Sequence, residues 1–177
     1  MHHDLRLVKP HPDYRDAFFA MVEDYRTAGE SRYQALMNFF HRDFAGYIRH
    51  LHNMARGIGL KPGWVPYTVY WSVAPERARL VGELHLRHWL TPVLEKEGGH
   101  IGYTITPSLR GQGYGTAQLA LGLEKARDFD LERVLITCNT ENIASARVIQ
   151  KNGGVFQDEV ISDHTGKPVS RYWITLS

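Results

Sequence analysis

The chain has 177 residues, of which 43% are hydrophobic, 11% aromatic and 23% charged, as in a globular protein rather than a disordered or fibrous one. Its 21 Lys and Arg against 19 Asp and Glu give a formal charge of only +2, which argues against nucleic acid or an anionic membrane as a partner. The single cysteine, Cys138, excludes an internal disulfide framework, and no apolar run approaches the roughly 20 residues that cross a bilayer. We therefore expect one soluble, cytoplasmic domain over residues 1–177, without a signal peptide.

The first third of the chain has the periodicity of helices. A short strand at residues 5–8 precedes Pro12, which suits a first helical turn because its missing N–H costs nothing there. Apolar residues recur on one helical face over residues 14–25. The same spacing over residues 33–51 predicts a second helix with Ser31 as its N-cap. We interpret the aromatic residues of both stripes as core packing rather than as a ligand site.

From Trp64 onward the apolar pattern changes to the period of strands. Two alternating runs, residues 64–73 and 80–87, predict an antiparallel hairpin, which a loop over residues 88–98 follows. The later elements are predicted as a strand at 99–106, a helix at 116–129, a buried strand at 133–138, a helix at 142–152 and a hairpin of 155–161 with 169–176. This order predicts an α/β domain with a mixed sheet.

The segment Arg110–Gly115, which reads RGQGYG between a strand and a helix, is the part most indicative of chemistry. Its three alternate glycines permit a tight turn and leave backbone N–H groups uncovered, and the next helix directs its positive dipole end to the same place. An anion such as a phosphate can bind there, beside the cation of Arg110. The spacing excludes a P-loop, and Thr116 weakens a dinucleotide fingerprint, while an ordinary glycine-rich turn stays an alternative.

This segment resembles the coenzyme A loop of the GNAT (Gcn5-related N-acetyltransferase) superfamily, whose pattern Arg/Gln-x-x-Gly-x-Gly/Ala is filled by Arg110, Gly113 and Gly115. The preceding HIGYTITP, residues 100–107, is similar to the family's fourth strand. Downstream, NIASAR at residues 142–147, followed by Asn-Gly after the helix, resembles the family's Asn-x-x-Ala/Ser helix. The chain is most similar to uncharacterised bacterial acetyltransferases of this superfamily.

The resemblance implies a GNAT-like fold, with a mixed, mainly antiparallel central sheet, flanking helices and a splay between the fourth and fifth strands. It implies acetyl-CoA as cosubstrate and an amine as acceptor. A small-molecule acceptor is favoured, because the helical pair within residues 10–60 is expected to wall off one end of the acceptor cleft. A non-catalytic acyl-CoA-binding module and a protein or peptide N-acetyltransferase are the alternatives, and a homodimer is left open.

The same resemblance assigns the coenzyme to the fourth strand, the glycine loop and the last helix. The coenzyme-binding residues expected are Tyr103, Thr104, Ile105, Arg110, Gly111, Gln112, Gly113, Tyr114, Gly115, Thr116, Asn142 and Ser145. The loop N–H groups would hold the pyrophosphate, and backbone groups of the strand would bind the pantetheine amides or stabilise an oxyanion. Asn142 would contact the pantetheine arm, or would serve only as a helix cap.

The attacking amine arrives as an ammonium and must lose a proton. Where several family members have a catalytic Glu, this chain has His100, and imidazole has a reference pKa of about 6.5 that suits proton uptake near neutrality. A histidine without a catalytic role is the alternative. Glu83 is the second candidate base, or else part of an ion pair. In the family, a Tyr of the last helix usually serves as the general acid that protonates the departing thiolate, but this chain has Ile149 there. The acid could instead be Tyr103, Tyr114 or water, or the thiolate could leave unprotonated.

The histidines and the cysteine do not indicate a metal site. The ten histidines are scattered, and His85 and His88, three apart on a predicted strand, point to opposite faces of the sheet. We therefore predict no metal. Cys138, at the end of a buried strand, is expected to pack as a small apolar residue rather than to act as a nucleophile.

Overall fold

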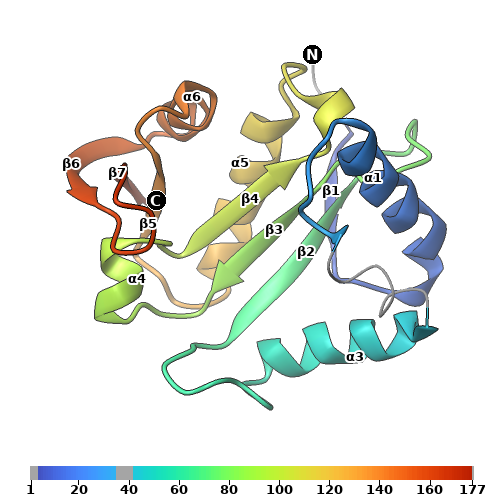
Figure 1. The fold of residues 1–177 in the computed structure, drawn as a ribbon. Helices are drawn as coiled ribbons and strands as arrows, with labels where there is room; N and C mark the ends of the chain where they lie inside the picture. Colours follow the sequence, from blue (N-terminus) through green and yellow to red (C-terminus); the bar gives the residue numbers. More distant parts are fainter. Residues whose placement is uncertain (1–3, 35–41, 177) are drawn as a thin grey trace.

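The computed structural model describes residues 4–34 and 42–176, in two antiparallel sheets with helices around them (Figure 1). Two single 3-10 turns, Pro12–Tyr14 and Pro107–Leu109, precede α1 and α5. The other elements are β1 (Arg6–Val8), α1 (Arg15–Thr27), α3 (Phe44–Ala55), β2 (Tyr67–Val73), β3 (Gly82–Arg87), α4 (Pro92–Lys96), β4 (Ile101–Ile105), α5 (Tyr114–Arg127), β5 (Arg133–Asn139), α6 (Ile143–Lys151), β6 (Val155–Ile161) and β7 (Pro168–Thr175).

The strands divide into a sheet of order β1-β2-β3-β4 and a sheet of order β5-β7-β6, and every strand pair between described residues is antiparallel. The two sheets join at one seam. There the His100 N–H donates to the Leu135 carbonyl at 2.7 Å, and the Leu135 N–H donates to His100 Nδ1 at 2.9 Å. Beyond the seam no ladder joins β4 to β5 among the described residues, which confirms the predicted splay between the fourth and fifth strands.

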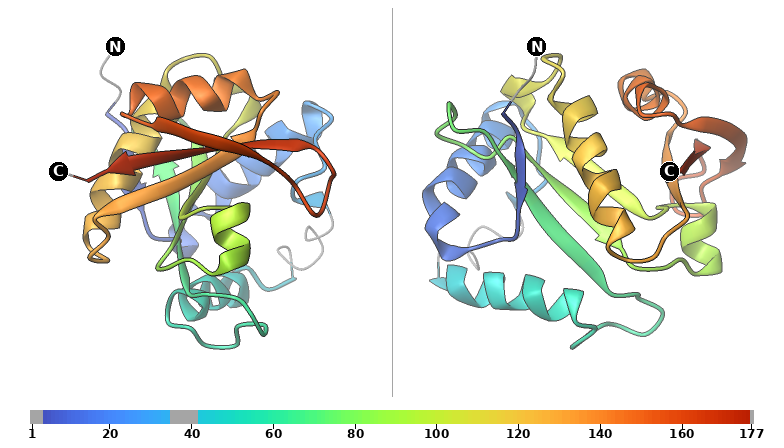
Figure 2. Two further views of the ribbon diagram at one scale, coloured as in Figure 1. Left: turned by 90° about the vertical axis from the view of Figure 1, so that its left-hand side faces the viewer. Right: turned by 180° about the vertical axis from the view of Figure 1, so that it is seen from behind.

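Helices α1 and α3 cover one face of the larger sheet and α5 covers the other, as the two turned views show (Figure 2). Side chains in cross-strand register share a face, so Trp71 on β2 and Glu83 on β3 lie on the α1–α3 side. Leu84 lies on the α5 side, packed in the same core cluster as Leu119. The larger sheet therefore separates an aromatic core beneath α1 and α3 from an aliphatic core beneath α5.

The helical pair differs from its prediction. Helix α3 is capped by Asp43, whose Oδ1 accepts the Gly46 N–H at 2.7 Å. The prediction of one unbroken helix that begins after Ser31 is therefore wrong. The middle of that predicted helix, residues 35–41, lies outside the described residues. None of the helices within residues 4–34 and 42–176 is long and apolar enough to cross a membrane.

A second difference is the short helix α4 inside the predicted loop of residues 88–98. Thr91 caps it by accepting the Leu94 N–H at 3.4 Å, and Pro92 occupies its first turn. Both are helix-start signals that the sequence displays, but the five-residue helix is too short to have a periodic apolar face.

Candidate active site

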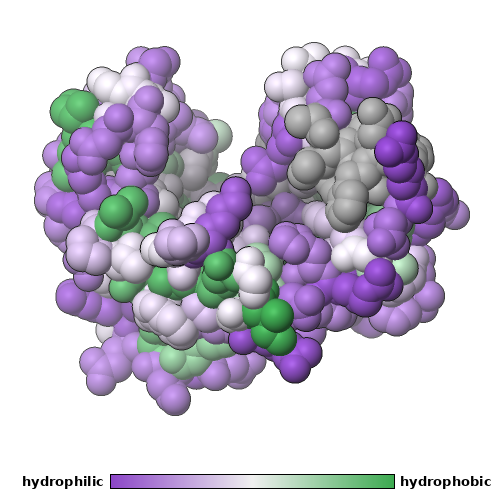
Figure 3. Space-filling view, turned by 60° about the horizontal axis from the view of Figure 1, so that its bottom comes forward, coloured by the Kyte–Doolittle hydropathy of each residue, from purple (hydrophilic) through white to green (hydrophobic). Residues whose placement is uncertain are grey.

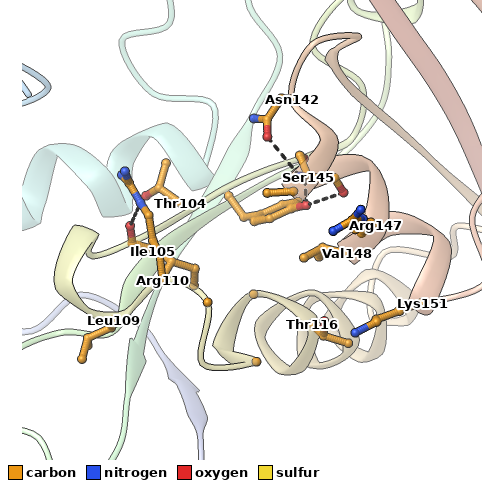
Figure 4. Close-up of a pocket in the computed structure, with 15 residues that line it drawn as sticks. Thr104, Ile105, Leu109, Arg110, Thr116, Asn142, Ser145, Arg147, Val148 and Lys151 are labelled. Atoms are coloured by element: carbon orange, nitrogen blue, oxygen red, sulfur yellow. Dashed lines mark hydrogen bonds between the residues drawn. The ribbon is translucent and has the colours of Figure 1, made fainter.

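A pocket of about 630 Å³ lies between β4, the start of α5 and α6 (Figure 4). Its lining includes all the expected coenzyme-contacting residues except Gln112 and Tyr114. Sequence reasoning missed five further lining residues, which are Leu109, Ala144, Arg147, Val148 and Lys151. The pocket therefore brings the glycine loop, the fourth strand and the last helix together, as expected.

The glycine loop opens α5 toward this pocket. Gly113 is the N-cap residue with φ +88°, a backbone conformation that other residues adopt only with strain, and no side chain caps the helix. The first N–H groups of α5 are therefore left for an anion. Gly115 serves close packing instead, since a Cβ there would lie 3.2 Å from Val148 Cγ2 on α6. A larger residue at Gly115 would push the two helices apart.

The side chains of Gln112 and Tyr114 point away from the pocket. The Gln112 amide donates to the Ser108 carbonyl at 3.1 Å. The buried Tyr114 hydroxyl donates to Glu76 at 3.1 Å and accepts from Arg77 at 3.2 Å. Only the backbone N–H groups of these two residues can serve a ligand, and Tyr114 is poorly placed to act as the acid.

The charges around the pocket differ from the expectation. Arg110 forms a bidentate ion pair with Glu30 at 2.6 and 3.0 Å, so its charge is largely balanced. Arg147 and Lys151, four residues apart on α6, have no ion-pair partner in the described part of the chain. The cations available to an anionic ligand therefore come from α6. Their spacing of four residues puts them on one face of α6, a signal that sequence analysis could have used.

Strand β4 offers backbone groups to the gap between the sheets. The Thr106 N–H donates to the Val81 carbonyl at 2.9 Å, which sets the phase of the β3–β4 ladder. Because hydrogen-bonded and non-bonded pairs alternate in antiparallel strands, Tyr103 and Ile105 turn their backbone groups away from β3 into the gap. The Ile105 carbonyl already accepts from Arg110 Nε at 3.1 Å, which leaves the Tyr103 groups and the Ile105 N–H.

A chain of hydrogen bonds crosses the pocket from β4 to α6. The Tyr103 hydroxyl lies 2.9 Å from Ser145 Oγ, and burial raises the pKa of Tyr103 to about 12, so it stays protonated. The Asn142 Oδ1 accepts the Ser145 N–H at 3.0 Å, and Asn142 is therefore a helix cap that also lines the pocket. Ile149 is completely buried in the core below α6, so the position of the family's usual Tyr faces away from the pocket.

His100, the first candidate base, lies at the seam between the sheets and outside the pocket lining. Its Nδ1 is occupied by the Leu135 N–H, and its ring meets Trp173 edge-on. Burial, together with the charges of Arg87 and Arg133, lowers the pKa of His100 to about 4. A pKa this low does not suit proton uptake near neutrality, which is the function that the sequence predicts for this imidazole.

Glu83, the second candidate, is 4% exposed and fully hydrogen-bonded. Its Oε1 accepts from His85 Nε2 at 2.8 Å and its Oε2 from Trp71 Nε1 at 3.2 Å. Burial opposes its ionisation, but the hydrogen bond and charge of His85, with the smaller effects of Arg32 and Trp71, lower the pKa of Glu83 below its usual range. Glu83 is thus a buried carboxylate, in register with the pocket residue Thr104.

The remaining polar candidates have structural surroundings. Within the described residues no group of three or more His, Cys, Asp and Glu is arranged to hold a metal ion. Cys138 is buried in the core, and burial raises the pKa of its thiol. His85 stacks on Tyr67 while His88 packs on Phe129, so the two histidines point to opposite faces as predicted.

Comparison with known proteins identifies the family. A family model described as an acetyltransferase (GNAT) domain matches residues 4–155. The fold is similar to that of RimL, a ribosomal L7/L12 alpha-N-protein acetyltransferase solved in complex with coenzyme A (TM-score 0.70, 17% identity, 97% of this chain and 94% of that one). It is also similar to Mycobacterium smegmatis RimJ in complex with CoA-disulfide (TM-score 0.70, 19% identity, 97% and 81%).

A third similar structure is a spermidine N-acetyltransferase from Vibrio cholerae in complex with CoA and spermine (TM-score 0.64, 12% identity, 97% of this chain and 95% of that one). A search of curated protein sequences found no match. At these identities the solved structures establish the fold, whereas the family model, which spans most of the chain, establishes membership of the family. Both agree with the glycine loop and the split sheet, and the chain therefore belongs to the GNAT family of acetyl-CoA-dependent N-acetyltransferases.

Proposed function

We propose that this protein transfers the acetyl group of acetyl-CoA to the primary amine of a small molecule. The observation that carries the proposal is the pocket between β4, α5 and α6, which combines an uncapped helix start with the unpaired cations Arg147 and Lys151. On the neighbouring strand β3, in register with Thr104 of the pocket lining, lies the ionised carboxylate of Glu83. An anion site beside β4 and a carboxylate on the adjacent strand suit a phosphate-bearing donor and a cationic acceptor.

The pocket residues divide the binding of acetyl-CoA among them. The first N–H groups of α5 would hold the pyrophosphate, and Arg147 and Lys151 would supply its counter-charge. The backbone groups of Tyr103 would bind the pantetheine end, and a strand N–H there would stabilise the oxyanion that forms when the amine attacks the thioester. The similar RimL and spermidine acetyltransferase structures contain coenzyme A and the similar RimJ structure contains CoA-disulfide, which supports this assignment.

Tyr103 is the proton donor that the geometry favours for the departing thiolate. Its hydroxyl is protonated, lines the pocket and shares a hydrogen bond with Ser145, through which a proton can be replaced. Ile149 and Tyr114 are both directed elsewhere. We therefore assign to Tyr103 the function that the family's usual Tyr performs from the last helix.

Of the two candidate bases, the geometry favours Glu83 over His100. Glu83 is ionised at neutral pH and lies across from Thr104, whereas His100 keeps its Nδ1 on the Leu135 N–H. A buried carboxylate attracts the ammonium of the acceptor and can accept a proton from it, directly or through a neighbouring group.

A protein or peptide N-terminus is a second candidate acceptor. The space-filling view shows a deep notch between two lobes of the molecule, which could admit an extended chain (Figure 3). RimL, whose substrate is a ribosomal protein, has a similar fold. We favour a small molecule because α1 and α3 cover the face on which Glu83 lies.

Thiol release from acetyl-CoA across a panel of alkylamines, aralkylamines, polyamines and short peptides tests the proposal. We expect turnover with at least one amine class, and a Glu83→Gln rate lower by about a hundredfold with unchanged coenzyme affinity by calorimetry. Binding of acetyl-CoA without turnover across the whole panel would instead indicate an acyl-CoA-binding module.

A further inference from the structure

A histidine lies beside Glu83 on the face opposite α5. His85 is two residues further along β3, so its side chain shares the face of Glu83, and its Nε2 lies 2.8 Å from Glu83 Oε1. The ring stacks parallel on Tyr67, with 5.5 Å between centroids and 5° between planes. This stacking and the carboxylate together hold the imidazole in one orientation.

The second nitrogen of His85 is available. A carboxylate oxygen accepts the hydrogen bond from His85 Nε2–H, and with Nε2 as the donor the neutral imidazole keeps its Nδ1 lone pair as an acceptor. No described residue hydrogen-bonds to Nδ1, and the side chain is 32% exposed while that of Glu83 is 5% exposed. A carboxylate behind an accessible imidazole is an arrangement that activates histidine as a base in other enzymes.

The strand next to His85 leaves room for a substrate. Gly102 on β4 is the cross-strand partner of His85, and a Cβ built on Gly102 would have no atom within 4 Å. The φ of Gly102 is not positive, so the backbone does not require glycine at this position. What the glycine provides is open space on the same face as His85, two residues before Thr104 of the coenzyme pocket.

A second pocket, of about 520 Å³, is lined by His85 together with residues of α4 and of the α3–β2 connection. Figure 1 shows α4 and this connection near the same end of the larger sheet. It is lined by Pro62, Gly63, Trp64, Val65, Tyr67, His85, Arg87, Thr91, Val93 and Leu94. The rings of Trp64, Tyr67 and His85 form its aromatic part, and no carboxylate is among its lining residues. We call this cavity the β3 pocket.

We infer that the β3 pocket holds the aromatic or apolar part of an acceptor monoamine and that His85, positioned by Glu83, is the catalytic base. This inference rests on the proposed function and specifies its substrate class. Glu83 is then a positioning residue that acts through His85, and Gly102 keeps the approach to the thioester open.

The proton and electron pairs balance in this arrangement. His85 Nδ1 takes one proton from the acceptor ammonium, and the freed lone pair attacks the thioester carbon to form the C–N bond. The C–S bond then breaks, its electron pair leaves with sulfur, and the second amine proton reaches the thiolate directly or by exchange with Tyr103. His85 returns its proton to solvent, while Glu83 stabilises the imidazolium throughout.

The charges around the β3 pocket select against polyamines. The guanidinium of Arg87 lines the pocket and donates to the Gly98 and Gly99 carbonyls, both at 2.9 Å, and burial lowers the pKa of Arg87. A second ammonium placed there would meet this cation with no carboxylate to balance it. A monoamine with an aromatic ring has no such cost and can stack on Trp64 and Tyr67.

The base is tested with His85→Gln against a matched control, His88→Gln, whose side chain lies on the opposite face. With 2-phenylethylamine, which is an ammonium at pH 7, we expect kcat to fall about a hundredfold in His85→Gln and to stay unchanged in His88→Gln. With 4-methoxyaniline, which is uncharged at pH 7, the loss should be much smaller because no proton must first be removed. An equal loss with both amines, or no loss, overturns the assignment of His85.

The β3 pocket is tested with Trp64→Ala against Trp89→Ala, because both tryptophans are about half exposed and only Trp64 lines the pocket. We expect Trp64→Ala to raise KM for 2-phenylethylamine about tenfold with little change in kcat, and Trp89→Ala to leave both unchanged. Wild-type enzyme should have a lower kcat/KM for spermidine than for 2-phenylethylamine. Equal effects of the two variants, or a preference for spermidine, overturn the pocket assignment.

Calorimetric titration with acetyl-CoA accompanies every variant and separates the two levels of failure. Turnover with spermidine or peptides but not with 2-phenylethylamine would leave the proposed function standing and refute the inference. Coenzyme binding without turnover of any amine would refute the proposed function, and the inference with it. A Gly102→Val variant that binds acetyl-CoA normally yet retains wild-type turnover would also count against the inference.

Discussion

Two titratable side chains, Glu83 on β3 and His100 just before β4, show how surroundings decide chemistry at the scale of the residue. Each is buried, but burial lowers the pKa of His100 to about 4, whereas the partners of Glu83 overcome burial and keep it ionised. The difference arises because Glu83 meets a histidine and an indole N–H, while His100 meets the cations Arg87 and Arg133. His100 is consequently a neutral link between the sheets and Glu83 a fixed negative charge.

A pH-dependent stability follows from His100. The folded pKa of about 4 lies below the ordinary value of 6.5, so the unfolded chain binds the extra proton between these values. Stability is therefore lost as the pH falls from about 6.5 to about 4, and roughly 2 kcal/mol of it between pH 7 and pH 5. In His100→Asn the side chain can still accept the Leu135 N–H but cannot titrate. This variant should therefore lose less stability than wild type when the pH falls from 7 to 5.

Urea unfolding of both proteins at pH 7 and pH 5 measures this difference. The quantity to compare is the change in unfolding free energy between the two pH values, since the substitution also alters packing. If wild type and His100→Asn lose equal stability on acidification, His100 does not carry the titration.

At the scale of the element, α6 combines a structural and a binding function. Its N-cap residue, Asn142, accepts the Ser145 N–H, and further along the same helix Arg147 and Lys151 line the pocket. Helix α5 lines the pocket with its first backbone groups and Thr116 but with no charged side chain, because Gly113 carries no side chain and Tyr114 is directed into the core. The anion site is thus shared between the dipole of one helix and the side-chain charges of the other.

The α6 cations should dominate the salt dependence of coenzyme binding. Arg147→Ala and Lys151→Ala should each weaken acetyl-CoA binding by about tenfold at low salt, because a hydrogen bond to a charged group contributes about 1.5–3 kcal/mol. The deficit should shrink at high salt, where screening is stronger. Calorimetry at low and high salt measures it, with Lys125→Ala on α5, outside the pocket lining, as the control. If both α6 variants bind acetyl-CoA as tightly as the Lys125→Ala control, neither Arg147 nor Lys151 contributes to coenzyme binding.

The two functions of Asn142 can be separated by two substitutions. Asn142→Ala removes the cap and should cost about 1 kcal/mol of stability, whereas Asn142→Asp keeps an oxygen acceptor for the Ser145 N–H and should not. Both variants lose the side-chain amide N–H of this pocket-lining residue, so both should bind acetyl-CoA up to about tenfold more weakly. Chemical denaturation and calorimetry measure the two effects. An unchanged affinity in Asn142→Asp would make Asn142 a cap alone.

At the scale of the whole molecule, the coenzyme pocket lies where the two sheets part. The sheets are joined at the His100–Leu135 seam, and the pocket walls come from β4 of one sheet and from α6, which follows β5 of the other. A ligand that contacts both walls therefore links the two halves of the fold (Figures 1 and 4).

Acetyl-CoA should consequently stabilise the protein as a unit. At a concentration 100 times its dissociation constant, the gain in unfolding free energy should be about 2.7 kcal/mol, visible as a thermal shift. Gly113→Val should abolish the shift, since its side chain would crowd the anion site and strain a backbone with φ +88°. A normal shift in that variant would place the coenzyme elsewhere.

The sequence by itself determined most of the order of elements and the family. Periods of two and 3.6 are local properties, so the hairpins, α5 and α6 could be located to within a few residues, and the glycine loop pointed to the pocket between β4, α5 and α6. The pairing of His85 with Glu83 was also accessible, because alternate residues of a strand share a face. Helix α4 escaped because it is too short to have a period.

Only the tertiary structure decided which charges are free and which groups titrate. Arg110 is balanced by Glu30, 80 residues away in the chain, and His100 loses its basicity to burial at a seam that forms only when the sheets meet. The direction of Ile149 into the core and the open space beside Gly102 are likewise products of packing. Such properties depend on contacts between residues far apart in the chain, and no local pattern contains them.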